Sequence, residues 1–403
     1  MNFKILDLFS GAGGFSCGLD SLDNFETVVA LDFNEYAIET FSHNFPNAST
    51  IVGDILEPNI KNQVVEVSRN RGVNMIIGGP PCQGFSNKGK KLGLNDPRNY
   101  LFLEYLEIVR EIEPDIFIIE NVKSMITAAN GYFMNEIQRE IESLGYFSTC
   151  NVLNSKYYGV PQSRERAFII AYKHKTLNIP EPDSKSFLTV RDAISDLSYL
   201  NSGEGKNKSF YIHNYQSKYQ KELREDSDLL YNHIASKHSE VALKKLALIP
   251  PECGKEFLPP EMIGNQKFKT TWGRLIWDEP SPTIDTRFDT PSNGKNSHPF
   301  LNRAITPREA ARIQSFPDKF QFFGRKTEIC KQIGNAVPPK LAKKLGESIN
   351  MQINKTTRIS NEYYKLFNGD SYDVINEIKN LNIEIDHIIT DPPYNISKNN
   401  NFS

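Results

Sequence analysis

Short apolar runs alternate with longer stretches of helical spacing along the first part of the chain, up to about Tyr172. We interpret the runs as strands, because each is rich in β-branched and aliphatic residues and is bounded by turn-forming residues. They lie at Lys4–Phe9, Thr27–Leu31, Thr50–Val52, Asn74–Ile77 and Asp115–Ile119. Strands that alternate with helices are typical of an α/β domain with a mainly parallel sheet.

Further elements are predicted from local signals. Two apolar runs, Phe147–Leu153 and Ala167–Tyr172, predict a hairpin pair, and Tyr100–Ile112 has apolar residues at helical spacing. A helix is expected to begin at Thr306, because a Thr cap is followed by Pro at the first position and Glu at the third. Another helix is expected after Pro338-Pro339, at Lys340–Ile353.

The alternation is lost from roughly His174 to Asn302, where Lys, Asn, Ser and Pro become frequent. This change predicts a smaller, mixed second domain with long loops. We therefore divide the chain into an α/β domain at 1–173, a second domain at 174–302, a return to the first domain at 303–353 and a tail at 354–403. In the tail, a strand is expected at Ile385–Thr390.

Composition is that of a soluble globular protein, with 39% hydrophobic and 24% charged residues among 403. The 47 Lys and Arg nearly balance the 49 Asp and Glu, so any surface that binds nucleic acid must be local. No apolar run approaches the about 18 residues of a membrane span. The first residues, Met1–Asp7, resemble a strand and not a signal peptide, so we expect no membrane partner and a cytoplasmic location.

The 5 cysteines are widely scattered. An odd number without Cys-x-x-Cys spacing argues against a disulfide framework and against a structural zinc site, so no metal site is expected. They occupy positions 17, 82, 150, 253 and 330.

Unusual residues follow the first three predicted strands, where ligands of open α/β sheets bind. The first strand ends in a glycine turn made of Phe9, Ser10, Gly11, Ala12, Gly13 and Gly14. Asp32 and Phe33 end the second strand, at the distance from the turn where an acid reaches a ribose hydroxyl in nucleoside-binding folds. Asp54 and Ile55 follow the third strand. The pattern Gly-x-Gly-Gly disfavours a pyrophosphate site, and a tight turn without a ligand stays an alternative.

Candidate catalytic residues follow the next strands. Cys82 lies in a Gly- and Pro-rich loop that includes Pro80, although a lone cysteine is more often a small buried hydrophobe. Glu120 comes directly after an apolar strand and is either a site group or a helix cap. Arg164 and Arg166 precede another strand, where they either form surface salt bridges or bind a carbonyl or phosphate.

Taken together and in this order, these segments resemble the DNA (cytosine-5) methyltransferase family of bacterial restriction–modification systems, over about residues 3 to 350. The similar segments are Asp7–Phe15, Pro80–Gln83, Glu120–Val122, Gln162–Arg166, Thr306–Pro317 and Gln332–Pro338. The resemblance implies an S-adenosylmethionine-dependent, Rossmann-like catalytic domain and a smaller mixed target-recognition domain between the Arg166 and Arg308 elements. It also implies that the last helix packs back near the first strand.

The resemblance assigns a role to each candidate. The Cys82 thiolate adds to carbon 6 of a cytosine, which makes carbon 5 nucleophilic. A protonated Glu120 acts at N3, and Arg166 with Arg164 stabilises charge near the O2 carbonyl. Asp32 holds the ribose hydroxyls, Phe33 packs on the adenine, Asp54 meets its amino group and Asn335 lies near the methionine part. Ile55, Pro80 and the glycine turn complete this S-adenosylmethionine site.

The implied substrate is double-stranded DNA, whose target base must leave the stack. Lys-rich stretches of the middle domain suit phosphates, although each single lysine is more readily explained as a solvated side chain. These lysines are Lys206, Lys208, Lys244, Lys245, Lys267 and Lys269. Thr271–Arg274 and Ser281–Arg287 are candidates for reading base edges. A restriction endonuclease and a companion amino-methyltransferase are expected as functional partners.

Three alternatives remain open at this stage. The first is an RNA cytosine-5 methyltransferase of the same fold that acts on transfer RNA. The second is a nicotinamide or flavin oxidoreductase, and the third is a DNA-binding protein without catalytic activity. The tail departs from the family pattern, because Tyr364–Ser403 resembles the start of an amino-methyltransferase, with Asp391-Pro392-Pro393-Tyr394 as its catalytic loop.

Overall fold

A computed structural model describes residues 1–81, 100–127, 132–182, 187–264, 270–353, 357–360, 365–368 and 371–379. The chain divides into two compact units, Met1–Ile349 and Asn350–Ser403. Within these described ranges, no helix is long and apolar enough to cross a membrane.

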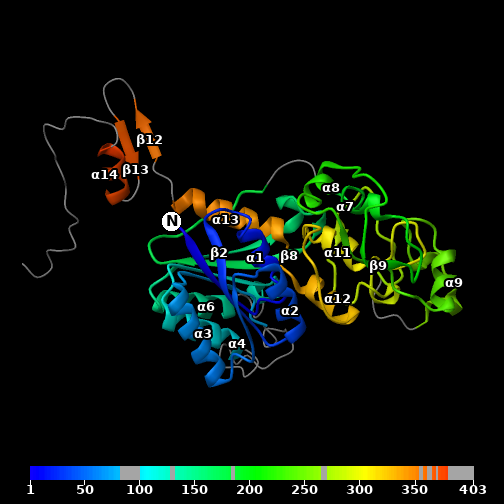
Figure 1. The fold of residues 1–403 in the computed structure, drawn as a ribbon, viewed down its shortest axis with the longest axis horizontal. Coiled ribbons are helices and arrows are strands. Elements are labelled where there is room, and N and C mark those ends of the chain that lie inside the picture. Colours follow the sequence, from blue (N-terminus) through cyan, green and yellow to red (C-terminus); the bar gives the residue numbers. More distant parts are fainter. Residues whose placement is uncertain are drawn as a thin grey trace, which may run out of the picture. The chain divides into compact units, whose positions relative to one another are not determined.

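The first unit is built on a seven-stranded sheet of order β3-β2-β1-β4-β5-β8-β6 (Figure 1). The strands β1 to β5 run parallel, whereas β8 is antiparallel to both of its neighbours, β5 and β6. Their bounds are β1 Phe3–Leu8, β2 Phe25–Asp32, β3 Ser49–Val52, β4 Met75–Gly78, β5 Ile116–Val122, β6 Phe147–Asn154 and β8 Glu165–Tyr172. The predicted α/β fold with a mainly parallel sheet is confirmed, and each of the seven strands expected up to Tyr172 is present within a few residues.

Helices cover both faces of this sheet (Figure 1). Apolar residues of α3, α4 and α6 pack against one face, where Leu6, Ile76 and Phe117 are almost completely buried. The helices of this region are α1 Gly14–Leu19, α2 Glu35–Asn44, α3 Pro58–Arg71, α4 Tyr100–Ile112, α5 Ser124–Thr127 and α6 Tyr132–Ser143. Burial on both faces explains why the central strands are continuous apolar runs instead of alternating patterns.

A second lobe lies beside the sheet and consists of short elements joined by loops (Figure 1). It contains α7 Val190–Ile194, β9 Gly205–Ser209, α8 Lys218–Leu223, β10 Leu230–Ile234, α9 Glu240–Leu248, α10 Pro260–Ile263 and β11 Ser281–Pro282. Single 3-10 turns occur at Ser155–Tyr158, Ser195–Leu197, Lys255–Phe257 and Pro291–Asn293. β9 pairs antiparallel with β10, and β11 pairs with the two-residue strand β7, Gln162–Ser163, which precedes β8 in the chain.

The helix expected after Thr306 is α11, Pro307–Ile313. The Thr306 side chain caps the Glu309 backbone N–H, and the Glu309 carboxylate accepts from the Thr306 N–H, which completes a capping box. The next helix, α12, spans Lys326–Asn335. Both helices share a hydrophobic core with α7 and α8. The boundary drawn at residue 303 therefore stays a prediction, because α11 and α12 also belong to the packing of the second lobe.

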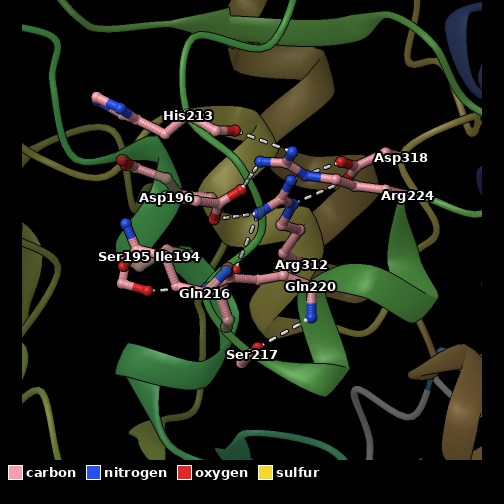
Figure 2. Close-up of polar contacts among 12 residues, drawn as sticks. Ile194, Ser195, Asp196, His213, Gln216, Ser217, Gln220, Arg224, Arg312 and Asp318 are labelled. Atoms are coloured by element: carbon pink, nitrogen blue, oxygen red, sulfur yellow. Dashed lines mark hydrogen bonds and ion pairs between the residues drawn. The ribbon is translucent and has the colours of Figure 1, made fainter.

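Buried ion pairs fasten α11 to this lobe (Figure 2). Arg312 donates to both carboxylate oxygens of Asp318 at 2.9 and 2.6 Å and to Asp196 at 2.6 Å. Arg224, directly after α8, reaches the second oxygen of Asp196. Buried charges are tolerated only when they are paired and hydrogen-bonded. The arrangement therefore fixes where α11 lies relative to the turn at Asp196.

The predicted last helix is α13, Pro339–Ile353, and it packs against α1. A Cβ atom added at Gly18 would overlap the backbone of Pro339, and one at Gly346 would lie 2.9 Å from Leu19 and 3.6 Å from Phe25. Phe25 is the register partner of Phe3 in β1. The expected packing of the last helix near the first strand is confirmed.

The second unit contains a small antiparallel pair, β12 Thr357–Ser360 and β13 Lys365–Asn368, followed by helix α14, Ser371–Lys379. The predicted strand Ile385–Thr390 and the loop Asp391–Tyr394 lie outside the described residues.

Candidate active site

The glycine turn leaves β1 with three residues in the left-handed region of backbone space. Phe9 has φ 57°, Gly11 φ 52° and Gly13 φ 89°. Glycine adopts this conformation without steric cost, which explains two of the three positions. A Cβ atom added at Gly11 would meet nothing within 4 Å. The backbone at Gly11 therefore borders open space at the carboxyl edge of the sheet.

Asp32 is held at the end of β2 by backbone donors. Its Oδ2 accepts the Gly11 N–H at 2.8 Å, and its Oδ1 accepts the Asn34 N–H at 2.9 Å. Burial raises the pKa of Asp32, and these backbone hydrogen bonds oppose the rise. The neighbouring Phe33 is 73% exposed. A carboxylate and a free aromatic ring thus stand side by side next to the glycine turn.

The end of β3 joins the same edge, because the Gly53 N–H donates to the Asp32 carbonyl at 3.1 Å. Asp54 is exposed, and its Oδ1 accepts the Leu56 N–H at 3.0 Å. Ile55 is buried. The three strand ends therefore bring together the residues that the sequence assigned to one ligand.

Asn335 reaches this edge from the far end of the chain. It is the last residue of α12 and is exposed. A Cβ atom added at Gly14 would lie 3.0 Å from the Ala336 Cβ and 2.5 Å from the Val337 carbonyl oxygen. The segment after Asn335 therefore packs directly on the glycine turn.

These residues fit a nucleoside ligand with a polar tail. The Ser10 hydroxyl is buried and has no hydrogen-bond partner among the described residues. Together with open space at Gly11, the Asp32 carboxylate and the exposed Phe33 ring, it provides polar and apolar groups of the kinds that S-adenosylmethionine would need.

A second group of charged residues lies at the end of β5. The Glu120 Oε1 is 3.0 Å from the Arg166 Nε, and Arg166 is the register partner of Val122 on the neighbouring strand. Burial raises the pKa of Glu120, while the positive charges of Arg166 and Arg164 act in the opposite direction. Because the net shift is upward, the structure favours a carboxyl group that holds a proton more firmly than usual.

Arg164 is 1% exposed, and its Nη1 donates to the Ile284 carbonyl at 3.3 Å. Its Nε and Nη2 have no hydrogen-bond partner in the described part of the chain. Burial and the like charge of Arg166 lower the pKa of Arg164. Buried donors without a partner are costly, so they commonly mark a site where an oxygen of a ligand is recognised.

The start of the cysteine loop lies beside Glu120. A Cβ atom added at Gly79 would lie 3.0 Å from the Glu120 Oε2, and the Asn121 side chain donates to the Pro80 carbonyl at 2.8 Å. Pro80 is buried, and Pro81 is the last described residue before Cys82. Cys82 lies outside the described residues, so its position stays a prediction.

Three residues of this region were not assigned a role from the sequence. Asn121 donates to the Pro80 carbonyl, Gly79 lies beside Glu120, and Gln162 contacts both the second lobe and the end of α11. The first and last of these stand inside segments that carry the family resemblance, which was the available signal. Gly79 was visible only as the second of two adjacent glycines, of which the first, Gly78, is the last residue of β4.

The interpretation of Thr271–Arg274 as a base-reading segment is wrong. Arg274 is 1% exposed, and its guanidinium donates to internal oxygens of Leu246, Ile249, His298, Leu301 and Asn302. Trp272 is also buried, in a small core. The segment therefore supports the lobe from within. In Ser281–Arg287, by contrast, Arg287 is exposed, as are Lys206, Lys208 and Lys244, whereas Lys267 and Lys269 lie outside the described residues.

Comparison with known proteins decides the family. The model of the C-5 cytosine-specific DNA methylase family matches residues 3–351. The chain belongs to this family.

Among curated relatives of this methylase, the chain is 36% identical to the type II methyltransferase M.DdeI of Desulfomicrobium norvegicum, over 86% of this chain and 88% of that protein. It is 34% identical to the type II methyltransferase M1.HphI of Haemophilus parahaemolyticus, over 87% of each. A solved structure described as a DNA modification methyltransferase encoded within an E. coli prophage matches with a TM-score of 0.70 and 25% identity, over 88% of this chain and 100% of that chain. The protein is accordingly a DNA cytosine-5 methyltransferase with the fold of S-adenosylmethionine-dependent methyltransferases.

Proposed function

We propose that the chain is the modification enzyme of a type II restriction–modification system, and that it methylates carbon 5 of a cytosine flipped out of duplex DNA through a covalent bond to Cys82. The observation that carries the proposal is the buried Glu120 carboxyl, paired with Arg166 and adjoining the loop that leads to Cys82. The family and the type II relatives support the same reaction.

Residues at the ends of β1, β2 and β3 would hold S-adenosylmethionine. Asp32 would accept the ribose hydroxyls, Phe33 would pack on the adenine, Asp54 would meet the adenine amino group and Asn335 would lie near the methionine part. The rest of the set is Phe9, Ser10, Gly11, Ala12, Gly13, Gly14, Ile55 and Pro80. When bound, the cofactor supplies a methyl group that is made electrophilic by its sulfonium.

The catalytic residues prepare the base. The Cys82 thiolate forms a bond to carbon 6, and the π electrons of the 5,6 double bond shift to carbon 5, where conjugation spreads them toward N3; this makes carbon 5 nucleophilic. Glu120 holds a proton that it shares with N3 as charge develops there. The free donors of Arg164, and Arg166 through its contact with Glu120, stabilise the O2 side of the ring. Carbon 5 would then form a bond to the methyl carbon as the bond from that carbon to the sulfonium breaks, which releases S-adenosylhomocysteine. When a water molecule takes the proton from carbon 5, the double bond re-forms and the Cys82 sulfur leaves carbon 6 with its electron pair.

Covalent capture tests this function directly. The recognition sequence is first identified by methylation-sensitive sequencing of DNA from cells that express the chain. A duplex with 5-fluorocytosine at the target position should then remain bound to the protein in the presence of S-adenosylmethionine, with the crosslink at Cys82. Cys82→Ser should form no crosslink and no methylated product. A crosslink at another cysteine, or methylation of RNA alone, would contradict the proposal.

Sequence choice is proposed to reside in residues 174–302, a target-recognition domain that includes the exposed Arg287. Base readout there would leave flipping and chemistry to the flanking residues. Replacing residues 175–297 by the corresponding segment of a relative should transfer the relative's recognition sequence. A folded, active hybrid that keeps the original sequence would refute this assignment.

The tail, which resembles the start of an amino-methyltransferase, is proposed to contribute nothing to cytosine methylation, because the segments that resemble the cytosine-5 family are complete by α13. Truncation after Asn354 keeps α13 complete, since this helix ends at Ile353. The truncated chain should methylate cytosine at the rate of the full chain. A companion amino-methyltransferase and a cognate restriction endonuclease would complete the system, and co-expression with the neighbouring genes would test for both.

A further inference from the structure

Two buried glutamine side chains form a continuous hydrogen-bonded chain through the centre of the first unit. The Ile284 N–H donates to the Gln162 Oε1 at 2.8 Å, the Gln162 Nε2 donates to the Gln314 Oε1 at 2.8 Å, and the Gln314 Nε2 donates to the Ile333 carbonyl at 2.7 Å. Gln162 and Gln314 are completely buried. The chain joins four segments: the loop after β11, strand β7, the end of α11 and helix α12.

Both ends of this chain are backbone groups, and this fixes its direction. Because the Ile284 N–H can only donate, the oxygen of the Gln162 amide must face it. Because the Ile333 carbonyl can only accept, the nitrogen of the Gln314 amide must face that carbonyl. No amide flip satisfies both ends, so each glutamine has one orientation, and a leucine at either position would leave buried partners unsatisfied.

Each end of this hydrogen-bonded chain adjoins a proposed functional group. Ile284, at one end, accepts from the Nη1 of Arg164, which also lies two positions after Gln162. Ile333 precedes Asn335, at the cofactor edge. The two end segments also pack directly on each other, because a Cβ atom added at Gly334 of α12 would lie 2.5 Å from the carbonyl oxygen of Asp285, the residue after Ile284. A shift of the end of α12 must therefore move the backbone at Ile284, and Arg164 with it.

We infer that Gln314 is a positioning residue that couples occupancy of the cofactor site to the placement of Arg164 for the target cytosine. The inference rests on the proposed function. Cofactor at Asn335 would fix the end of α12, the two amides would transmit that position to Ile284, and Arg164 would be held where its free donors meet the base. Coupling between two sites is reciprocal, so cofactor and target DNA should strengthen each other's binding.

The test compares DNA affinity with and without the cofactor product, which binds but cannot react. The dissociation constant of a duplex that carries the recognition sequence is measured in the presence and absence of S-adenosylhomocysteine. In the wild type, the cofactor product should tighten binding at least about tenfold, within the usual range of coupling between sites. In Gln314→Leu and in Gln314→Met, this ratio should fall to near one, while the affinity for S-adenosylhomocysteine alone changes little.

A matched control is Gln220→Leu. Gln220 is equally buried, but its amide contacts Arg191, Ser195 and Gln216 and not the catalytic strand (Figure 2). It should lose stability as Gln314→Leu does and keep the wild-type affinity ratio.

A double-mutant cycle gives a second measurement. If the two amides act as one chain, Gln162→Leu and Gln314→Leu together should lose no more coupling than either alone. A wild-type ratio in the folded Gln314 variants, or an equal loss in Gln220→Leu, would overturn the inference. Failure of the proposed function would show differently, as wild-type protein that forms no 5-fluorocytosine crosslink.

Discussion

The Nε atom of Arg166 lies 3.0 Å from the Oε1 atom of Glu120, across two antiparallel strands, at the edge of the sheet where β5 ends and β8 begins. The contact has two effects on the carboxyl group. It orients Glu120, and it limits the rise in pKa that burial would otherwise produce. A carboxyl group that holds a proton near neutral pH and then shares it with N3 of cytosine needs a fixed orientation and a pKa that is raised only in part.

Replacement of Glu120 by Gln should lower kcat on the order of 10²–10⁴-fold, the usual contribution of a positioned acid. Affinity for S-adenosylmethionine should stay close to that of the wild type, because the cofactor residues lie at other strand ends. The raised pKa of Glu120 also sets a pH dependence. If the protonated form is active, the wild-type rate falls as pH rises through the pKa of the folded enzyme, and this decline should be absent in Glu120→Gln. Loss of cofactor affinity with an unchanged rate would place Glu120 in the cofactor site instead.

Gly79→Ala should disturb the same carboxyl group from the opposite side. The new Cβ would lie 3.0 Å from the Glu120 Oε2, closer than most such contacts, so the carboxylate or the loop must move. A displacement of this size in a catalytic group can lower kcat about ten- to a hundredfold. Single-turnover methylation measures the effect, and an unchanged rate would show that the site tolerates the shift.

Asp7→Asn should change how stability depends on pH. Burial raises the pKa of Asp7 from the ordinary 3.8 to about 8, while a hydrogen bond from Ser16 acts against the rise. Between these values the folded protein keeps a proton that the unfolded chain has released, so stability falls as pH increases through this window. Urea unfolding at pH 5 and pH 8 should show a smaller decline for Asp7→Asn than for the wild type. Equal declines would mean that Asp7 is ionised in the folded protein.

Arg312→Met should destabilise the first unit by about 3–5 kcal/mol, because it removes the buried guanidinium that pairs with both Asp196 and Asp318 and leaves each carboxylate only part of its partners. Chemical denaturation measures the loss. A suitable control is Arg191→Met, which removes the exposed ion pair with Asp278 and should change stability far less. Comparable effects for the two variants would argue that the buried ion pairs contribute no more than the exposed one.

Local signals in the sequence predict most of the sheet and of the helix starts. The central strands are recognisable because both of their faces are buried, and the start of α11 because Thr306 and Glu309 satisfy each other's backbone groups. The acids at strand ends, Asp32 and Glu120, are recognisable because a carboxylate directly after a buried apolar strand indicates either a functional group or a helix cap.

Contacts between distant segments could not be predicted in this way. Gln162 and Gln314 are separated by 152 positions, and nothing in either local pattern indicates that their amides meet. The position of Arg274 was predicted wrongly because a charged residue in a polar segment usually lies on the surface. Only the fold shows that carbonyl oxygens of the interior surround its guanidinium.

The packing of α13 on α1 bears on how the chain of the first unit could be reconnected. Gly346 of α13 adjoins Phe25, whose ring stacks on that of Phe3 with centroids 4.8 Å apart, so the closing helix lies next to the first strand. A circular permutant in which α13 precedes β1 through a short linker would retain every contact described for the sheet and the strand ends. The order in which the segments are synthesised is thus separable from the architecture that they build.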